Sequence, residues 1–314
     1  MFRETKTVIG SVTVRVKGTS SDALSAGQRI SGLLEAIDLR PHGLAASAIL
    51  VINRMRDPLP GRLSLYDQRR TQEWEHRVND VIANLARTAC RPASGTVPTN
   101  SGAVLFSDRS ELLACLSRDW CNGSVIEQWW WRTLFKTAGV RSTVLNAWLE
   151  APEYAPAALE QLAASSTLIR FVRMLGSSDS RKLLQSITSR FVLPDLAATC
   201  AAIPMFVAAP PGSSKVLFAG KAPLQPGAVV VAESLPGIAP WWAWAPEVFG
   251  YDLDPLQECL LGIGLTLARA PHVARSRSFA QDVRRWSRIE AQGDGGMAPV
   301  FSSAAAVPHV AGAA

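Results

Sequence analysis

The sequence is poor in the residues that most often carry catalysis or bind metals. It contains four histidines and five cysteines in 314 residues. The cysteines form an odd set at irregular spacing, without a Cys-x-x-Cys pair. Such a set predicts free thiols in a reducing compartment and argues against a disulfide framework or a zinc site. We therefore expect a cytoplasmic protein that holds no structural metal and no cofactor.

Long apolar runs and the common catalytic motifs are also missing. The N-terminus leads into alternating Thr and Val, which is not the pattern of a signal peptide. The most apolar segments, 196–209 and 260–270, are too short to cross a bilayer. No phosphate loop and no Gly-x-Ser-x-Gly motif occurs. Gly262-Ile263-Gly264 lacks the third glycine of a dinucleotide fingerprint, so we interpret it as a close helix contact.

One enzymatic hypothesis rests on Glu73 and His76. A Glu-x-x-His pair on one helix face can ligate iron or manganese, but such sites need matching carboxylates from other helices. No second copy of the pattern exists in the sequence. A solvated ion pair on the polar side of a helix is therefore the preferred interpretation, and we expect a protein that is not an enzyme.

The hydrophobic pattern of residues 1–106 predicts a small βαβαβ layer. Alternating valines over 8–16 predict a half-buried strand, the apolar run 48–52 a strand covered on both faces, and 103–106 a third short strand. Amphipathic helices are expected over 24–37 and 65–89, between these strands. Because helical patterns dominate the chain beyond residue 106, the predicted fold class is α+β, predominantly α.

Residues 107–203 predict a stack or bundle of helices. Asp108 and Glu111 have the spacing of an N-terminal cap, and Asn122-Gly123 is typical of a helix end. Ser124 and Glu127 then predict a second capping box. Helices are also expected over 144–149, 157–164, 168–175 and 179–191, with a break at 176.

The run Trp129-Trp130-Trp131 in this stack is too wide for one buried face. Three consecutive helical positions fan through about 200° at roughly 100° per residue. Trp130 shares a face with Leu134, so we expect it in the core. Trp129 and Trp131, together with the adjacent Arg132, are candidates for contact with a partner protein, because Trp and Arg are enriched at interfaces.

The rest of the chain divides into a Pro- and Gly-rich connector at 204–240, a helical segment at 241–291 and a low-complexity tail at 292–314. The helical segment opens on a second cluster of candidate partner-binding residues, Trp241, Trp242 and Trp244. Tryptophan is also a large core residue, so burial is the alternative for both clusters.

Positive charge is concentrated near the C-terminus. The chain carries a formal net charge of +6, and residues 269–288 contain six arginines and a single acid, Asp282. This predicts a helix with an apolar face and a basic face. The basic face is either a solvated surface that meets an acidic protein or a polyanion-binding site. The candidate polyanion-binding residues are Arg275, Arg277, Arg284, Arg285 and Arg288.

Three phrases in the sequence resemble a known group of proteins. They are the run 49–61 (ILVINRMRDPLPG), the pair 117–120 (SRDW) and 129–132 (WWWR), and the run 260–271 (LLGIGLTLARAP). Together they are similar to large proteins encoded beside the sheath, tube and baseplate genes of bacterial phage-tail-like contractile injection systems. The resemblance spans most of the chain up to Glu290, and the tail after 292 departs from the longer members.

The resemblance implies an assembly or accessory protein made in the cytoplasm or carried on the particle, without catalytic residues. The preferred hypothesis is therefore a non-enzymatic scaffold that binds protein partners. The alternative is a nucleic-acid-binding module centred on the C-terminal arginines.

Overall fold

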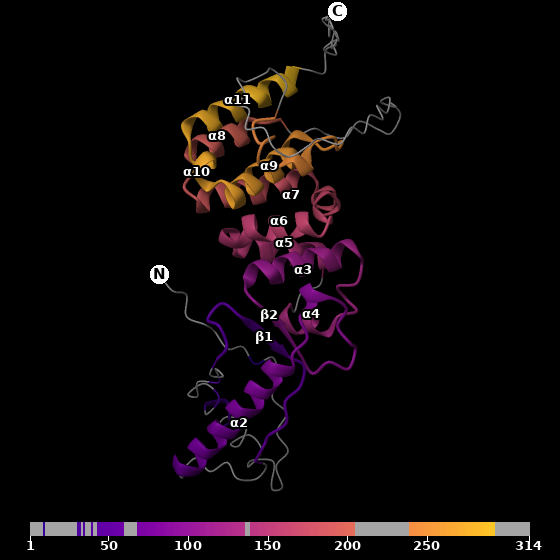
Figure 1. Ribbon diagram of the computed structural model, residues 1–314, viewed down its shortest axis with the longest axis vertical. Coiled ribbons are helices and arrows are strands. Elements are labelled where there is room, and N and C mark those ends of the chain that lie inside the picture. Colours follow the sequence, from indigo (N-terminus) through magenta and orange to yellow (C-terminus); the bar gives the residue numbers. More distant parts are fainter. Residues whose placement is uncertain are drawn as a thin grey trace, which may run out of the picture.

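The computed structural model describes residues 9, 30–32, 34, 39, 43–59, 68–135, 139–204 and 239–292. A stack of helices lies at one end and a small sheet with one long helix at the other (Figure 1). The predicted strand at 8–16 falls outside the described residues, except for position 9. Most of the predicted helix at 24–37, nearly all of the connector 204–240 and the tail also fall outside them.

The described sheet has two antiparallel strands, β1 (Ile49–Ile52) and β2 (Ala103–Phe106), with α2 (Gln68–Thr88) between them in sequence. Successive side chains of a strand point to opposite faces. On one face Val51 packs into the core of the helical stack, and on the other Leu50 packs against a second apolar cluster, which is formed mainly by buried side chains of α2. The predicted covering of this strand on both faces is confirmed.

The helical part confirms the expected predominance of helix. Its elements are α3 (Arg109–Cys121), α4 (Trp129–Leu134), α5 (Val140–Glu150), α6 (Ala155–Ala164), α7 (Leu168–Arg190), α8 (Pro194–Ala202), α9 (Pro255–Arg269), α10 (Pro271–Ala274) and α11 (Arg277–Gln292), with 3-10 turns η1 (Pro92–Ser94), η2 (Pro152–Tyr154) and η3 (Pro246–Val248). The predicted helices end at 191, so the sequence pattern does not predict α8, which begins at Pro194. This proline stands in the first turn, where a proline is tolerated.

The observed ends of α3 and α4 test two of the predicted capping signals. Asp108 accepts a hydrogen bond from the Glu111 amide at 2.9 Å, which confirms the predicted cap of α3. The predicted capping box at Ser124 is wrong, because the Ser124 amide closes α3 by donating to the Asp119 carbonyl at 2.9 Å. As a result α4 begins only at Trp129 and Ile126 is exposed.

The predicted break at Gly176 is confirmed inside α7. Gly176 has φ 73° and ψ 171°, a conformation that favours glycine and interrupts the helix. Arg141 of α5 crosses to this break, where its Nη2 donates to the Leu175 carbonyl at 2.6 Å. Its side chain also bonds Asp179, with Nε to Oδ2 at 3.0 Å. The break is thus tied to the neighbouring helix by one arginine.

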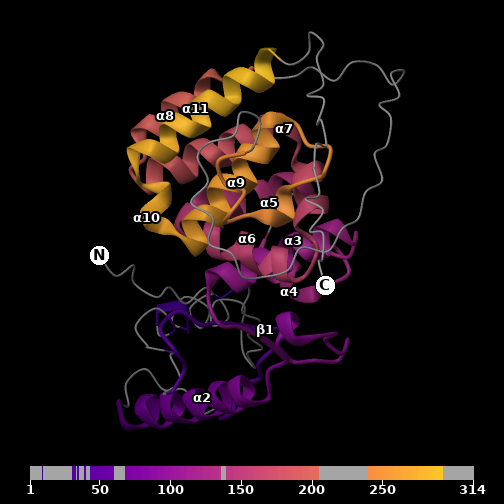
Figure 2. The ribbon, with the colours of Figure 1, turned by 45° about the horizontal axis from the view of Figure 1, so that its top comes forward.

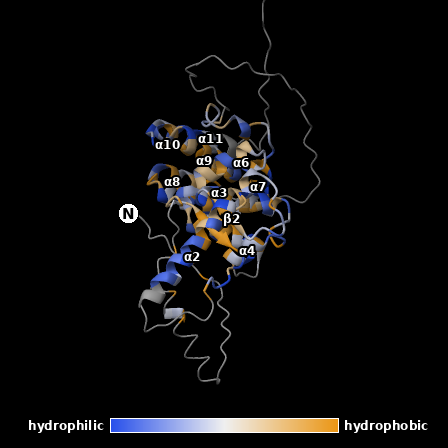
Figure 3. Cartoon of the chain, turned by 60° about the horizontal axis from the view of Figure 1, so that its bottom comes forward, coloured by the Kyte–Doolittle hydropathy of each residue, from blue (hydrophilic) through white to orange (hydrophobic). Residues whose placement is uncertain are grey.

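One hydrophobic core runs through the helical stack and includes residues from Val51 to Trp286. α9 packs against α6 and α7, and α11 packs against α8, so the segments 107–203 and 241–291 share this core. Figure 2 shows α8 and α11 side by side at the end of the stack, and Figure 3 shows apolar residues gathered between the helices. None of the helices that the structure describes is long and apolar enough to cross a membrane.

Candidate functional site

The tryptophans of α4 belong to the core. Trp129, Trp130 and Trp131 are 9%, 3% and 2% exposed. The Trp131 ring stacks on Phe106 of β2 with centroids 5.5 Å apart, and its Nε1 donates to Asp119 Oδ2 of α3 at 2.8 Å. This corrects the expectation that Trp129 and Trp131 face outward. The six-residue helix lies beside the sheet and next to α3 (Figure 1), and all three of its tryptophans are buried. Of the first candidate set, only Arg132 is exposed.

The second tryptophan cluster is divided between core and surface. Trp241 is 1% exposed and lies against Trp286 of α11, with ring centroids 4.7 Å apart. The predicted close helix contact is found at Gly264, where a Cβ would lie 2.4 Å from Leu159 Cδ1 of α6. At Gly262 the close neighbour is the turn residue Trp241, whose Cδ2 would lie 2.0 Å from an added Cβ. Trp244 is half-buried, and Trp242 is exposed. Trp241 therefore anchors the segment that presents Trp242.

Three exposed aromatic side chains in this segment form the aromatic patch, defined as Trp242, Phe249 and Tyr251. They are 37%, 63% and 51% exposed. The Trp242 and Phe249 rings meet edge to face with centroids 4.6 Å apart. Phe249 and Tyr251 were not predicted from the sequence as site residues. Their signal was an aromatic pair, Phe-Gly-Tyr, in a loop between a tryptophan cluster and a helix cap.

A charged clamp holds the aromatic patch on the core. Arg269, at the end of α9, donates to Glu247 Oε1 at 2.5 Å and to Glu160 Oε2 of α6 at 2.7 Å. It also donates to the Trp244 carbonyl at 2.8 Å. The hydrogen bond from Arg269 lowers the pKa of Glu247, although partial burial acts in the opposite direction. One of the six C-terminal arginines is therefore structural, because two acids already neutralise it.

The loop that carries the patch is also fixed at its C-terminal end. Asp254 caps α9 by accepting from the Leu256 amide at 2.9 Å, and Ser177 of α7 donates to the same carboxylate at 2.8 Å. Arg173 of α7 donates to the Asp252 carbonyl at 3.3 Å. The aromatic side chains thus project from a short segment that is anchored on both sides.

Glu247→Gln should loosen this segment. The folded pKa of Glu247 is lowered, so its ionised carboxylate stabilises the folded state. This stabilisation is present above the ordinary glutamate pKa of about 4.3 and is lost as pH falls through the folded pKa. We expect faster amide hydrogen exchange over 242–252 in the variant at neutral pH. We also expect wild-type exchange, corrected for intrinsic rates, to approach that of the variant in acid. Equal protection at neutral pH would contradict the role of the clamp.

The five candidate polyanion-binding arginines are all exposed. On α11, at about 100° per residue, Arg284 and Arg288 fall within about 20° of Arg277. We call these three side chains the arginine stripe. Phe279, Val283 and Trp286 are buried and lie about 120° to 180° around the helix from Arg277. The predicted separation into a basic and an apolar face is confirmed.

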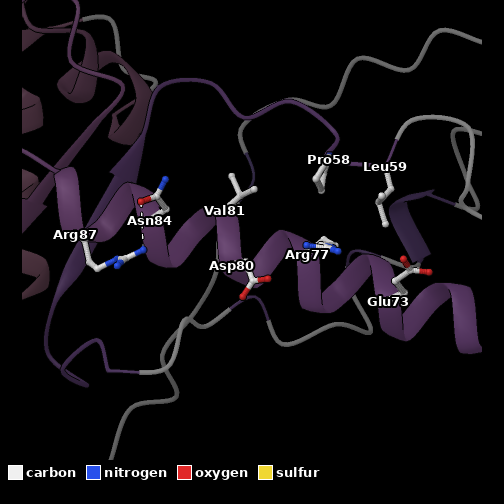
Figure 4. Close-up of a pocket in the computed structure, with 8 residues that line it drawn as sticks. All are labelled: Pro58, Leu59, Glu73, Arg77, Asp80, Val81, Asn84 and Arg87. Carbon is white, nitrogen blue, oxygen red and sulfur yellow. Dashed lines mark hydrogen bonds between the residues drawn. The ribbon is translucent and has the colours of Figure 1, made fainter.

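A hollow lies along α2, at the other end of the molecule. It has a volume of about 610 Å³ and is lined by Pro58, Leu59, Glu73, Arg77, Asp80, Val81, Asn84 and Arg87 (Figure 4). Glu73 lines it, but His76 pairs with Asp80, with Nε2 and Oδ2 3.8 Å apart. In the part of the chain that the structure describes, no three His, Cys, Asp or Glu side chains are grouped to hold a metal ion.

No family model, no curated protein and no solved structure matches this chain. The aromatic patch and the arginine stripe are therefore the features of the described surface that bear on function. Both lie in the C-terminal helical segment, where Trp241 beneath the patch contacts Trp286 on the buried face of α11.

Proposed function

We propose that this protein is a non-enzymatic assembly or accessory protein that docks a partner protein through the aromatic patch. The observation that carries the proposal is that the patch is exposed and yet anchored. Trp242, Phe249 and Tyr251 stand on a segment held by the Arg269 clamp and by buried Trp241. The other large exposed apolar side chains described outside this segment, such as Ile126 and Val192, come from separate elements.

An anchored aromatic patch has the physical properties of a binding surface. Trp and Tyr are enriched among the residues that dominate interface energies, because they bury a large area with few rotatable bonds. A segment already fixed before binding loses little conformational entropy when the partner docks. Without a partner, the aromatic patch leaves apolar surface exposed to water. Because this exposure is unfavourable, it favours association with another protein.

The proposed partner is a component of a phage-tail-like contractile injection particle. This part of the proposal rests on the resemblance of the runs 49–61, 117–120, 129–132 and 260–271. Such a protein would act in the cytoplasm during assembly or remain on the particle. Arg132, exposed at the end of α4, is a further candidate contact on a different part of the surface.

The test compares tagged full-length variants expressed in the native host, with captured proteins quantified by mass spectrometry. We expect wild type to enrich sheath, tube or baseplate proteins. The double variant Trp242→Ser/Phe249→Ser should reduce that enrichment at least tenfold, because truncating a hot spot weakens binding by about 2 kcal/mol or more.

The matched control is Ile126→Ser, which removes another exposed apolar side chain on a distant element. It should retain the captured proteins. Full retention by the double variant, or equal loss in the control, would overturn the proposal. Thermal unfolding of all three proteins verifies that the variants remain folded.

A further inference from the structure

We infer that the arginine stripe of α11 is a second binding site, which grips the phosphate backbone of a nucleic acid without reading its sequence. The stripe consists of Arg277, Arg284 and Arg288, and it spans about 16 Å along the helix at 1.5 Å per residue. α11 lies at the end of the helical stack, with its opposite face against α8 (Figure 2). The stripe is therefore open along its length.

The charge of the stripe is largely uncompensated by the described neighbours. Asp282 pairs with Arg285, at 3.6 Å between Oδ1 and Nη1, and Arg285 lies about 80° around the helix from Arg277. α8, which packs on α11, contributes one exposed acid, Asp195. Exposed Arg275 precedes the helix and adds to the positive field. A polyanion that follows the helix would meet several guanidinium groups in succession.

The chemistry of the stripe favours phosphate over a protein partner. The exposed side chains of α11 between 277 and 288 are arginines, Ser278 and Gln281, without an apolar side chain among them. Protein interfaces need a desolvated apolar centre, which this face does not offer. Arginine binds phosphate oxygens bidentately, and residues 269–292 contain arginine but no lysine.

The burial of the apolar face argues against a membrane surface. Basic amphipathic helices bind lipid by inserting their apolar side chains below the headgroups. In α11 those side chains, Phe279, Val283 and Trp286, are packed in the core. Because Trp286 is buried, it is also unable to stack on a base. The stripe can therefore contact only the phosphate backbone of the nucleic acid, and such contacts carry no sequence information.

The probe is a fluorescent 20-base-pair DNA duplex, titrated with full-length protein and followed by anisotropy. For three phosphate contacts we expect log affinity to fall with log salt at a slope of about −2.7, which is about 40-fold between 50 and 200 mM potassium chloride. A second duplex of scrambled sequence should bind equally. Arg277→Gln/Arg284→Gln/Arg288→Gln should abolish this binding, and the corresponding triple lysine variant should retain the salt slope.

The matched control is Arg54→Gln/Arg56→Gln/Arg77→Gln, which removes the same net charge from other exposed positions. It should bind DNA like wild type. Equal weakening in the control, affinity that is insensitive to salt, a strong preference for one duplex, or tighter binding to polyglutamate or anionic vesicles would overturn the inference. The Trp242→Ser/Phe249→Ser variant should keep DNA binding, so the two proposals fail separately.

Discussion

Gly262→Ala should lower the free energy of unfolding by about 3 kcal/mol, although alanine is the better helix former. The added methyl group would sit 2.0 Å from Cδ2 and 2.3 Å from Cγ of Trp241. These are ring atoms of a side chain that is itself packed on Trp286. Overpacking typically destabilises by about 1–3 kcal/mol, and expelling a buried indole by about 3–5 kcal/mol. The gain in helix propensity, about 1 kcal/mol, offsets only part of this.

Gly264→Ala is the control for this prediction, on the same helix two residues away. Its methyl group would approach Leu159 Cδ1 to 2.4 Å, but the next atom, Leu159 Cγ, is 3.8 Å away. A terminal methyl group moves by a rotamer change, whereas an indole ring moves as one body. We therefore expect a loss of about 1 kcal/mol or less. Chemical denaturation gives the free energy of unfolding of both variants. Equal decreases in the two variants would contradict the close packing of Trp241 on Gly262.

The same substitution also tests how the aromatic patch is supported. Trp241 precedes Trp242 and fixes its position from below. If Gly262→Ala displaces Trp241, capture of the partner should fall together with stability, whereas Gly264→Ala should leave capture unchanged.

Trp131→Ala should lower the free energy of unfolding by about 4–5 kcal/mol. The variant removes one of the largest fully buried side chains and leaves a cavity against Phe106 and Phe135. It also removes the indole N–H that donates to Asp119. Burial raises the pKa of that carboxyl, and the bond from Trp131 opposes the shift, so the variant leaves a buried acid with poorer solvation.

The pH dependence of this variant has a defined sign. A raised folded pKa means that ionised Asp119 destabilises the fold once pH exceeds the unfolded pKa. Without the Trp131 donor that penalty grows, so the stability deficit of Trp131→Ala should be larger at neutral pH than near pH 4. Trp242→Ala, at the exposed tryptophan, should change stability by about 1 kcal/mol or less at either pH. A similar decrease in the free energy of unfolding for Trp131→Ala and Trp242→Ala would contradict the burial of Trp131.

Local sequence signals predicted most element types and several element ends. Asp108 caps α3 by a bond to an amide three residues away, and Gly176 interrupts α7 through its own backbone conformation. Because both effects are local, a short stretch of sequence is enough to predict them. The two faces of α11 also followed from periodicity, because the arginines and the apolar side chains alternate at the spacing of a single helix. The capping box at Ser124 failed because the preceding helix end competes for the same amide.

The sequence by itself determined a predominantly helical chain with a basic outer face on its last helix. Only the tertiary structure decided which aromatic side chains are exposed. Trp131 is covered by β2 and α3, and Trp241 fits into the space left by Gly262, while Phe249 has no such cover. The physical reason is that burial depends on what other segments bring to a side chain. The hydrophobic periodicity of a helix indicates which of its faces is apolar, but it does not indicate which other segments cover that helix.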